Sequence, residues 1–231
     1  MALPPLLQPA NTGEVTEFLR RTAATPLVQG ARGRLIFALD ATASRQPGWD
    51  QACQLQGDLF AAAATLGGVA LQLVWYRGYD EFHAEPWQTD AATVQRRMSA
   101  VHCRGGLTQI GRVLAHALAE TSRHRVNALV LIGDCLEEQL PPLTALAGQL
   151  GVLGVPIFLF QEGQNADAAR GFREIARLSR GAHCAFDAGS ARQLRELLGA
   201  VAVYAAGGRT ALERLCATAG SEQLLRLTRQ L

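Results

Sequence analysis

The sequence predicts an α/β fold in which a doubly wound, mostly parallel sheet has helices on both faces, one antiparallel edge hairpin and extra helices at the C-terminus. Short apolar runs, such as residues 34–40 and 155–160, alternate along the chain with longer segments whose apolar residues follow the helical period. The runs lack the polar alternation of a half-exposed strand, which is typical of strands buried on both faces of a parallel sheet. Alternation of such strands with helices predicts the doubly wound arrangement.

The expected elements follow one another in a regular order. Strands are expected at 34–40, 69–76, 81–87, 127–133, 155–160 and 182–186. Helices are expected at 12–24, 47–66, 90–101, 140–150 and 167–179, with others starting near 110 and 190. The Arg77-Gly-Tyr-Asp80 turn joins the second and third strands, so these two should form a hairpin at the sheet edge.

Local signals mark the helix ends. Thr12 and Asp90 are residue types that cap helix N-termini, because their side-chain oxygens accept a bond from a free backbone N–H. Pro141 suits the first turn of a helix. Gly68 and Gly151 follow the last periodic residues and are expected to end their helices.

Composition restricts the class of protein. The chain has 231 residues, 48% of them hydrophobic and 18% charged, which is enough to bury a substantial core. The formal charge is only +2 and the basic residues are scattered, so we expect no nucleic-acid partner. No run is long enough to span a membrane and the N-terminus lacks the pattern of a signal peptide, so no membrane association is expected.

The cysteines point to a reducing compartment. They are odd in number and widely spaced, which suits free thiols rather than a disulfide framework: Cys53, Cys103, Cys135, Cys184 and Cys216. We therefore expect a cytoplasmic protein. Three parts are expected along the chain, namely an N-terminal extension with a short helix at 1–30, the main domain at 31–206, and a C-terminal helical extension at 207–231 that packs on the domain or docks a partner.

Oxygen-bearing side chains follow the first predicted strand of the main domain. The apolar run at 34–40 ends at Asp40, and hydroxyls follow at every second position, at Thr42 and Ser44. A strand end that presents a carboxylate and two hydroxyls on one side offers three oxygen ligands to a hard cation. The segment therefore predicts the start of a metal site.

Two later segments supply further oxygen ligands. Thr108 follows the Gly105-Gly106 turn, and Asp134 follows the strand at 127–133. Ligands of open α/β sheets bind beyond the carboxyl ends of the strands, near the point where the strand order reverses. If the strands at 34–40 and 127–133 are neighbours, Asp40 and Asp134 can share one cation. Because all five ligands are oxygen, Mg²⁺, Mn²⁺ or Ca²⁺ is favoured over zinc.

With these residues, the chain resembles the von Willebrand factor A (VWA) domain family over residues 34 to about 205. The metal-ion-dependent adhesion site (MIDAS) of that family has the pattern Asp-x-Ser-x-Ser, then a Thr in a Gly-rich loop, then an Asp after a later strand. The matching residues are Asp40, Thr42, Ser44, Thr108 and Asp134. Two positions depart from the pattern, since Thr42 stands where Ser is usual and Cys135 where Gly is common.

The resemblance implies a Rossmann-like fold and a function without catalysis. It implies a protein module that binds a divalent cation, Mg²⁺ or else Mn²⁺ or Ca²⁺, and captures an acidic side chain of a partner protein. Cytoplasmic proteins that resemble the family often work with an ATPase or within a multi-subunit assembly. Three arginines are candidates for contacting the acidic partner: Arg45, Arg77 and Arg104.

Other interpretations of these residues stay open at this point. The domain could be a metal-free scaffold, with Asp40 capping a turn and the hydroxyls bonded locally. A hydrolase built on Ser44, His102 and Asp134 lacks a nucleophile elbow, and no phosphate-binding loop is present. The acidic pair after Asp134, at 137–138, is expected to be a solvated helix start that could make the rim of the site acidic.

Overall fold

The computed structural model describes residues 33–49, 69–186 and 191–219. The helix expected at 12–24, residues 50–66 of the helix expected at 47–66, and residues 220–231 lie outside the described residues. Within the described part of the chain, no helix is both long and apolar enough to cross a membrane.

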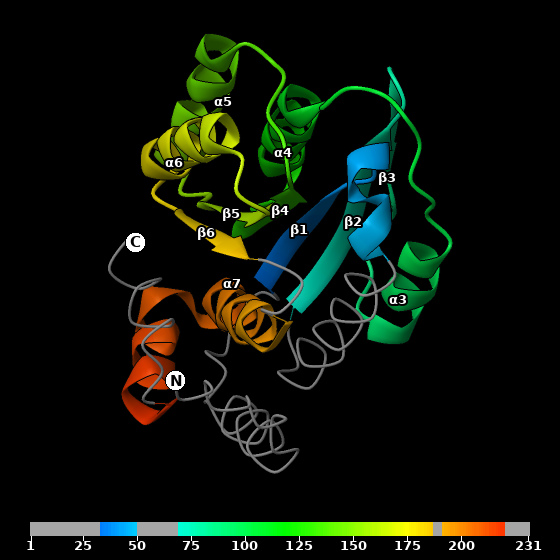
Figure 1. The fold of residues 1–231 in the computed structure, drawn as a ribbon. Helices are drawn as coiled ribbons and strands as arrows, with labels where there is room; N and C mark the ends of the chain where they lie inside the picture. The colour runs from blue at the N-terminus through cyan, green and yellow to red at the C-terminus, as the bar shows by residue number, and fades with distance from the viewer. Residues whose placement is uncertain (1–32, 50–68, 187–190, 220–231) are drawn as a thin grey trace, which may run out of the picture.

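Six strands form one sheet in the order β3-β2-β1-β4-β5-β6. All neighbouring pairs are parallel except β2 and β3, which form the expected antiparallel hairpin at the edge (Figure 1). The mostly parallel sheet with one antiparallel edge strand is thereby confirmed. The strands are β1 (Gly33–Asp40), β2 (Val69–Arg77), β3 (Glu81–Ala84), β4 (Ala128–Gly133), β5 (Ile157–Glu162) and β6 (Ala182–Phe186).

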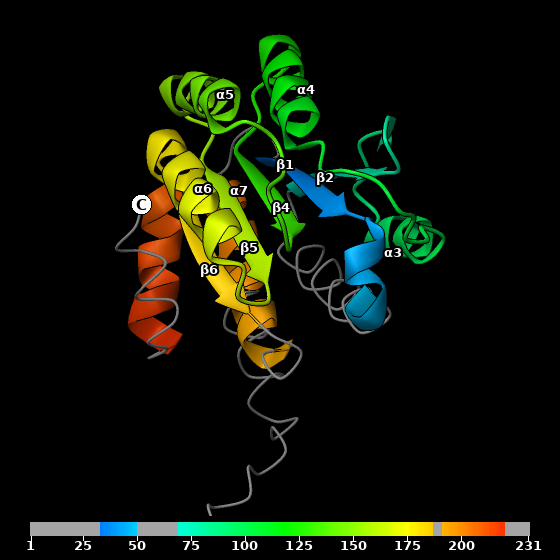
Figure 2. The same cartoon turned by 45° about the horizontal axis from the view of Figure 1, so that its top comes forward.

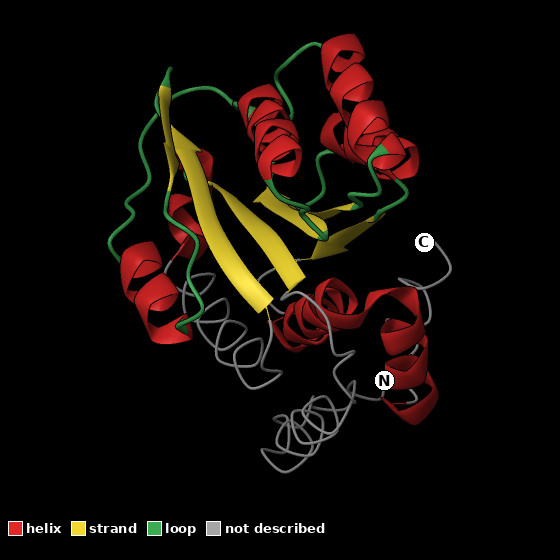
Figure 3. Cartoon of the chain, turned by 180° about the vertical axis from the view of Figure 1, so that it is seen from behind, coloured by secondary structure: helices red, strands yellow, loops and turns green. Residues whose placement is uncertain are grey.

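Helices cover both faces of the sheet, as Figures 2 and 3 show from two further directions. Helices α4, α5 and α6 lie on one face, and α3 and α7 lie on the other. A short 3-10 helix, η1, follows β1. The helices are η1 (Ala43–Gly48), α3 (Ala91–Ser99), α4 (Ile110–Arg123), α5 (Leu140–Val152), α6 (Ala166–Ser179) and α7 (Ala191–Ala219).

Two apolar cores explain why the apolar runs of the sequence show no polar alternation. Successive side chains of a strand point to opposite faces of the sheet. On β1, Ile36 and Ala38 pack under α4, α5 and α6, whereas Leu35, Phe37 and Leu39 pack against the α3 and α7 side. Both faces are buried, so both sets of positions must be apolar.

The final helix is broken at one glycine. Gly208 has φ 67° and ψ −164°, which divides α7 into two helical parts. The boundary that we propose between the main domain and the C-terminal extension, at 206–207, lies next to this break. Beyond it, Leu212 and Leu215 are buried in the same core as β1, so this described part of the extension packs on the domain.

The histidine of β6 is expected to make stability depend on pH. Burial lowers the pKa of His183 from 6.5 to about 4. Below pH 6.5 His183 is protonated in the unfolded chain, whereas in the folded protein it stays neutral down to about pH 4. The folded protein therefore loses stability as the pH falls from 6.5 to about 4. The loss is on the order of 1–2 kcal/mol after allowance for partial exposure.

Denaturant unfolding from pH 7 to pH 4 measures this loss. In the His183→Gln variant, position 183 no longer carries a titratable group. Glutamine still offers a polar partner to Gln161, whose Oε1 lies 3.0 Å from His183 Nε2. We expect its stability to fall less than that of the wild type between pH 6.5 and pH 4. Equal slopes in the two proteins would show that His183 is not responsible.

Candidate functional site

The strand order places the predicted site at the point where the chain reverses its direction of winding. From β1 the chain moves outward to β2 and β3, and from β4 it moves the other way to β5 and β6. β1 and β4 are parallel neighbours, with Leu39 paired to Ile132. Their carboxyl ends therefore meet at one edge, where Asp40 and Asp134 follow. Open α/β sheets bind ligands at such a switch point.

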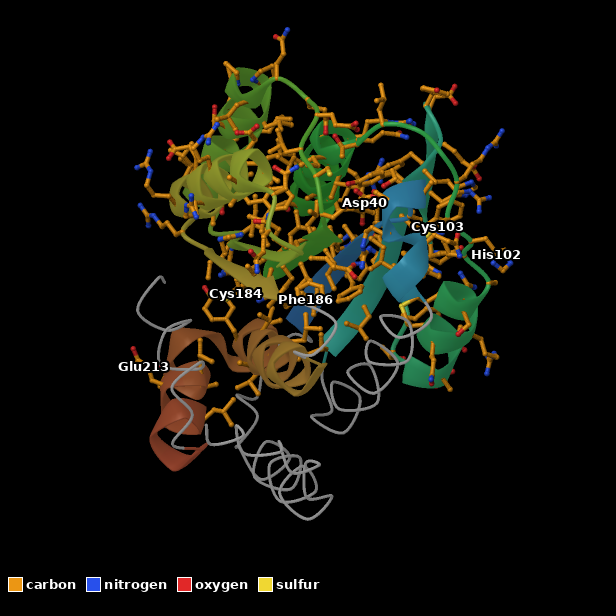
Figure 4. All side chains as sticks on the ribbon, viewed as in Figure 1. Asp40, His102, Cys103, Cys184, Phe186 and Glu213 are labelled. Carbon is orange, nitrogen blue, oxygen red and sulfur yellow. The ribbon has the colours of Figure 1, made fainter. Side chains whose placement is uncertain are left out.

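Asp40 is a buried carboxylate that is only partly satisfied. It has no exposed surface and lies where β1 enters η1 (Figure 4). Its Oδ1 accepts a bond from the Thr42 N–H at 2.8 Å, which closes a tight turn after the strand. Its Oδ2 is buried and has no hydrogen-bond partner of standard geometry, although the Tyr76 hydroxyl lies near enough to interact with the carboxylate. One oxygen therefore shapes the loop, and the other makes no hydrogen bond of standard geometry.

Thr42 and Ser44 lie together after Asp40. Their hydroxyl oxygens are 3.1 Å apart, Thr42 is buried, and Ser44 is exposed. Of the two hydroxyl residues that follow Asp40, one therefore lies inside the loop and the other at its surface.

Asp134 lies beside Asp40 across the β1–β4 pair. Gly133, the residue before Asp134, lies against the Asp40 side chain, because a Cβ at Gly133 would be in ordinary van der Waals contact with Asp40 Oδ2, at 3.5 Å. Asp134 is half-buried, and its Oδ1 is a buried atom without a hydrogen-bond partner. Two carboxylate oxygens that lack partners therefore occur at the ends of adjacent strands.

The Gly105-Gly106 loop holds Thr108 against the rest of this edge. A Cβ at Gly106 would lie 1.9 Å from the Gly78 carbonyl oxygen, so the two loops touch as only glycine allows. The Leu107 N–H donates to the same carbonyl at 3.1 Å, and Thr108 is buried. The loop is also tied to β1, because the Arg104 N–H donates to the Ala41 carbonyl at 3.0 Å.

The acidic pair after Asp134 lies before the start of α5 and contacts the loop of Thr108, so the expected helix start is wrong, although Glu137 is exposed as expected. Glu137 Oε2 accepts from the Thr108 N–H at 2.9 Å, while the Glu137 N–H donates to Thr108 Oγ1 at 3.1 Å. Glu138 accepts from the N–H groups of Ile110 and Gly111 at 2.6 and 2.8 Å. Glu138 therefore caps α4 from another loop, and both carboxylates join the segment of Thr108 to the segment of Asp134.

Arg45 is not at the surface, so it is unsuited to direct contact with a partner. Its side chain is 0% exposed, with Nη1 donating to the Asp40 carbonyl at 2.8 Å and Nε to Glu162 Oε2 at 3.0 Å. Arg77 is bound to Glu81 at 2.7 Å and to the His102 carbonyl. Arg104 is the most exposed of the three, at 72% of its side chain, and it lies 3.6 Å from Glu81.

A buried tyrosine and a buried thiol complete the surroundings, and sequence reasoning assigned neither to the site. The Tyr76 hydroxyl has no hydrogen-bond partner of standard geometry. Burial raises the pKa of Tyr76 well above its ordinary value, and the nearby Asp40 carboxylate adds to the rise. Burial likewise raises the pKa of the Cys103 thiol to about 11, so both groups stay neutral at physiological pH. The only sequence signal for Tyr76 is its position at the end of the strand that is expected at 69–76.

The charged form of Asp40 is disfavoured both by burial and by a neighbouring carboxylate. Burial raises the pKa of Asp40 above 3.8, and the Asp134 carboxylate raises it further, although bonds from Thr42 and the charge of Arg45 oppose the rise. Two close carboxylates with unpaired oxygens are costly without a counter-ion. The described residues contain no cluster of three or more His, Cys, Asp or Glu side chains able to hold a metal. The donor set of two carboxylates and three hydroxyls nevertheless fits a hard cation.

Comparisons with known proteins identify the fold. No protein-family model matches the sequence, and no curated protein sequence matches it significantly. A von Willebrand factor type A structure from Catenulispora acidiphila is similar, with a TM-score of 0.60 and 18% identity, over 75% of this chain and 43% of that one. The VWA domain of SpRpn10 gives a TM-score of 0.57 at 14% identity, over 74% of this chain and 95% of that one.

The fold is that of von Willebrand factor A domains. A third similar VWA-like structure carries a metal. Proximal thread matrix protein 1 from the mussel byssus, with a zinc-occupied MIDAS motif, gives a TM-score of 0.58 at 16% identity, over 73% of this chain and 46% of that one. At these identities the likeness establishes the fold, and the function has to be argued from the residues of this chain.

Proposed function

We propose that this VWA-like domain is a non-catalytic, divalent-cation-dependent module that captures an acidic side chain of a partner protein. The observation that supports it most is the pair of buried, unpartnered oxygens, Asp40 Oδ2 and Asp134 Oδ1, at the ends of adjacent strands. Native proteins rarely leave such atoms unsatisfied without a reason, and a missing ion is one. One structure of similar fold, the mussel protein with zinc in its MIDAS motif, agrees with this interpretation.

Each residue has a distinct part in the proposed site. Asp40 and Asp134 supply the negative charge, with at least one of them acting through water. Thr42, Ser44 and Thr108 supply neutral oxygens, directly or through water. With few charged ligands bound to it, the cation keeps enough positive charge to attract a carboxylate from outside.

The chemistry of the ligands points to the kind of cation. All five proposed ligands are oxygen, which favours Mg²⁺, or Mn²⁺ or Ca²⁺, over softer metals. Zinc in the mussel protein shows that a MIDAS motif can also hold a softer ion. Zinc is therefore the competitor to include when the selectivity of this site is measured.

Partner and location follow from the same proposal. The partner offers an exposed aspartate or glutamate, and we propose that it belongs to an ATPase or a multi-subunit assembly in the cytoplasm. The free thiols at Cys103, Cys135 and Cys184 suit a reducing compartment. A catalytic role for Ser44, His102 and Asp134 is not supported, because His102 is exposed and its ring bonds neither of the other two among the described residues.

A metal-free scaffold is the second candidate. It is favoured by the local bonds that Asp40 Oδ1 and the two hydroxyls at 42 and 44 already make, which hold the loop without an ion. In this case the C-terminal helices or the sheet edge would contact another subunit. The two candidates differ in whether partner capture needs a cation.

Affinity capture from the cells that produce the protein distinguishes these candidates. Immobilised wild type is incubated with lysate in Mg²⁺ or in chelator, and the bound proteins are identified by mass spectrometry. We expect a partner that is lost in chelator and lost with Thr108→Val, which replaces the hydroxyl by a methyl of similar size. Thr108→Ser keeps the hydroxyl and should retain the partner.

The Thr108→Val variant is expected to remain folded. It removes the acceptor for the Glu137 N–H, which costs about 1 kcal/mol. A partner that binds equally well in chelator and to Thr108→Val would favour the metal-free scaffold.

A further inference from the structure

A buried arginine lies directly behind the proposed cation site. The Arg45 guanidinium is 0% exposed, donates to the Asp40 carbonyl at 2.8 Å, and lies 5.4 Å from the ring of Trp49. Its Nη2 has no hydrogen-bond partner in the structure. A cation that is fully removed from water acts on its neighbours with little screening.

Glu162 is the only described acidic side chain that forms an ion pair with this guanidinium. Its Oε2 accepts from Arg45 Nε at 3.0 Å, and 21% of its side chain is exposed. Arg45 is bonded to the backbone carbonyl of Asp40, and Glu162 follows Gln161, which is paired with Gly133 across β4 and β5. Both groups therefore lie at the edge that carries the site, but the guanidinium is fully buried, whereas the carboxylate of Glu162 is partly exposed and better screened by water.

We propose that the Arg45–Glu162 pair sets how tightly the site holds its cation. This inference rests on the proposed function. The Arg45 guanidinium would repel a divalent ion beside Asp40, and Glu162, which is better screened by water, would cancel only part of that repulsion. Without a partner, the site therefore binds its cation less tightly than it would if Arg45 were absent. An acidic side chain of the partner supplies the missing negative charge.

The inference predicts effects of opposite sign, which a merely structural pair would not produce. Removing the charge of Arg45 takes away a repulsion and should tighten Mg²⁺ binding. Removing the charge of Glu162 leaves the guanidinium uncompensated and should weaken it. If the pair only held the loop in place, either change would weaken binding.

Calorimetric titration of Mg²⁺ into chelator-stripped protein tests this with Arg45→Gln, Glu162→Gln and the double variant. Glutamine keeps a donor or an acceptor at each position. We expect Arg45→Gln to bind on the order of tenfold more tightly and Glu162→Gln several-fold more weakly. The double variant should lie nearer to the wild type than either single variant.

Two conservative variants protect the test against poor folding. Arg45→Lys and Glu162→Asp keep the charges and change the geometry, so their Mg²⁺ affinities should stay near that of the wild type. If Arg45→Gln fails to fold, weak binding by Glu162→Gln together with unchanged binding by Glu162→Asp still supports the role of charge. Weaker binding by both glutamine variants, with a wild type that binds normally, would overturn the inference and leave the proposed function standing. No binding by the wild type would overturn both.

Discussion

Replacing Asp40 with asparagine is expected to abolish the stabilisation that Mg²⁺ gives the folded protein, without making the metal-free protein less stable. Asparagine keeps an oxygen for the Thr42 N–H, which now donates to Asp40 Oδ1 at 2.8 Å. It removes a buried charge that lies beside Asp134 and whose Oδ2 has no partner. The variant therefore loses a ligand of the cation and also the electrostatic cost of the empty site.

Thermal or urea unfolding in excess Mg²⁺ and in chelator measures both effects. An ion present at 100 times its dissociation constant should stabilise the wild type by about 2.7 kcal/mol. The control is Asp167→Asn, which removes an exposed carboxylate on α6 and should leave the Mg²⁺ response intact. If Mg²⁺ stabilised the Asp40→Asn protein as much as the wild type, Asp40 would not be a ligand of the cation.

Replacing Glu138 with alanine is expected to destabilise the protein by about 2 kcal/mol and to weaken Mg²⁺ binding as well. Glu138 accepts two backbone N–H groups at the start of α4, where the preceding residue, Gln109, makes no side-chain cap. A carboxylate at a helix N-terminus is also favoured by the helix dipole. Its loss leaves only the two Glu137–Thr108 hydrogen bonds to join the loop that carries Asp134 to the loop that carries Thr108.

Urea unfolding gives the stability, and calorimetry gives the affinity for Mg²⁺. The matched control is Glu174→Ala, which removes a partly exposed carboxylate that pairs with Arg177 on the surface of α6 and should cost less than 1 kcal/mol. Glu138→Gln keeps one acceptor and should fall between alanine and the wild type. A Glu138→Ala protein as stable as Glu174→Ala would show that the bonds from Ile110 and Gly111 to Glu138 contribute nothing to stability.

Most of the fold was open to prediction because the signals that specify it are local. The apolar runs that become β1, β4 and β5 are buried on both faces, and Asp90 caps α3 through its own side chain, as expected from its residue type. The hairpin of β2 and β3 was indicated by the turn after Arg77. Strand ends differ by at most three residues from the expected ones, because pairing with neighbours extends or shortens a strand.

The prediction of the site was uneven for a related reason. Asp40, Thr42 and Ser44 are close in sequence, so they meet in the turn that joins β1 to η1, although the chain no longer follows the strand period there. The roles of Glu137 and Glu138 depend on residues about 28 positions away, and no local pattern reveals such a contact. Arg45 follows two exposed residues and reads as a surface side chain, yet its partner Glu162 is 117 positions away, on β5.

The measurement that tests the central claim most directly is calorimetric titration of Mg²⁺, and then of Mn²⁺, Ca²⁺ and Zn²⁺, into chelator-stripped protein, with Asp40→Asn as the control. We expect saturable binding to one site in the wild type, stronger for at least one of the oxygen-preferring ions than for Zn²⁺, and no such binding in the variant. A folded wild type that binds none of these ions, or a variant that binds like the wild type, would contradict the proposed cation site.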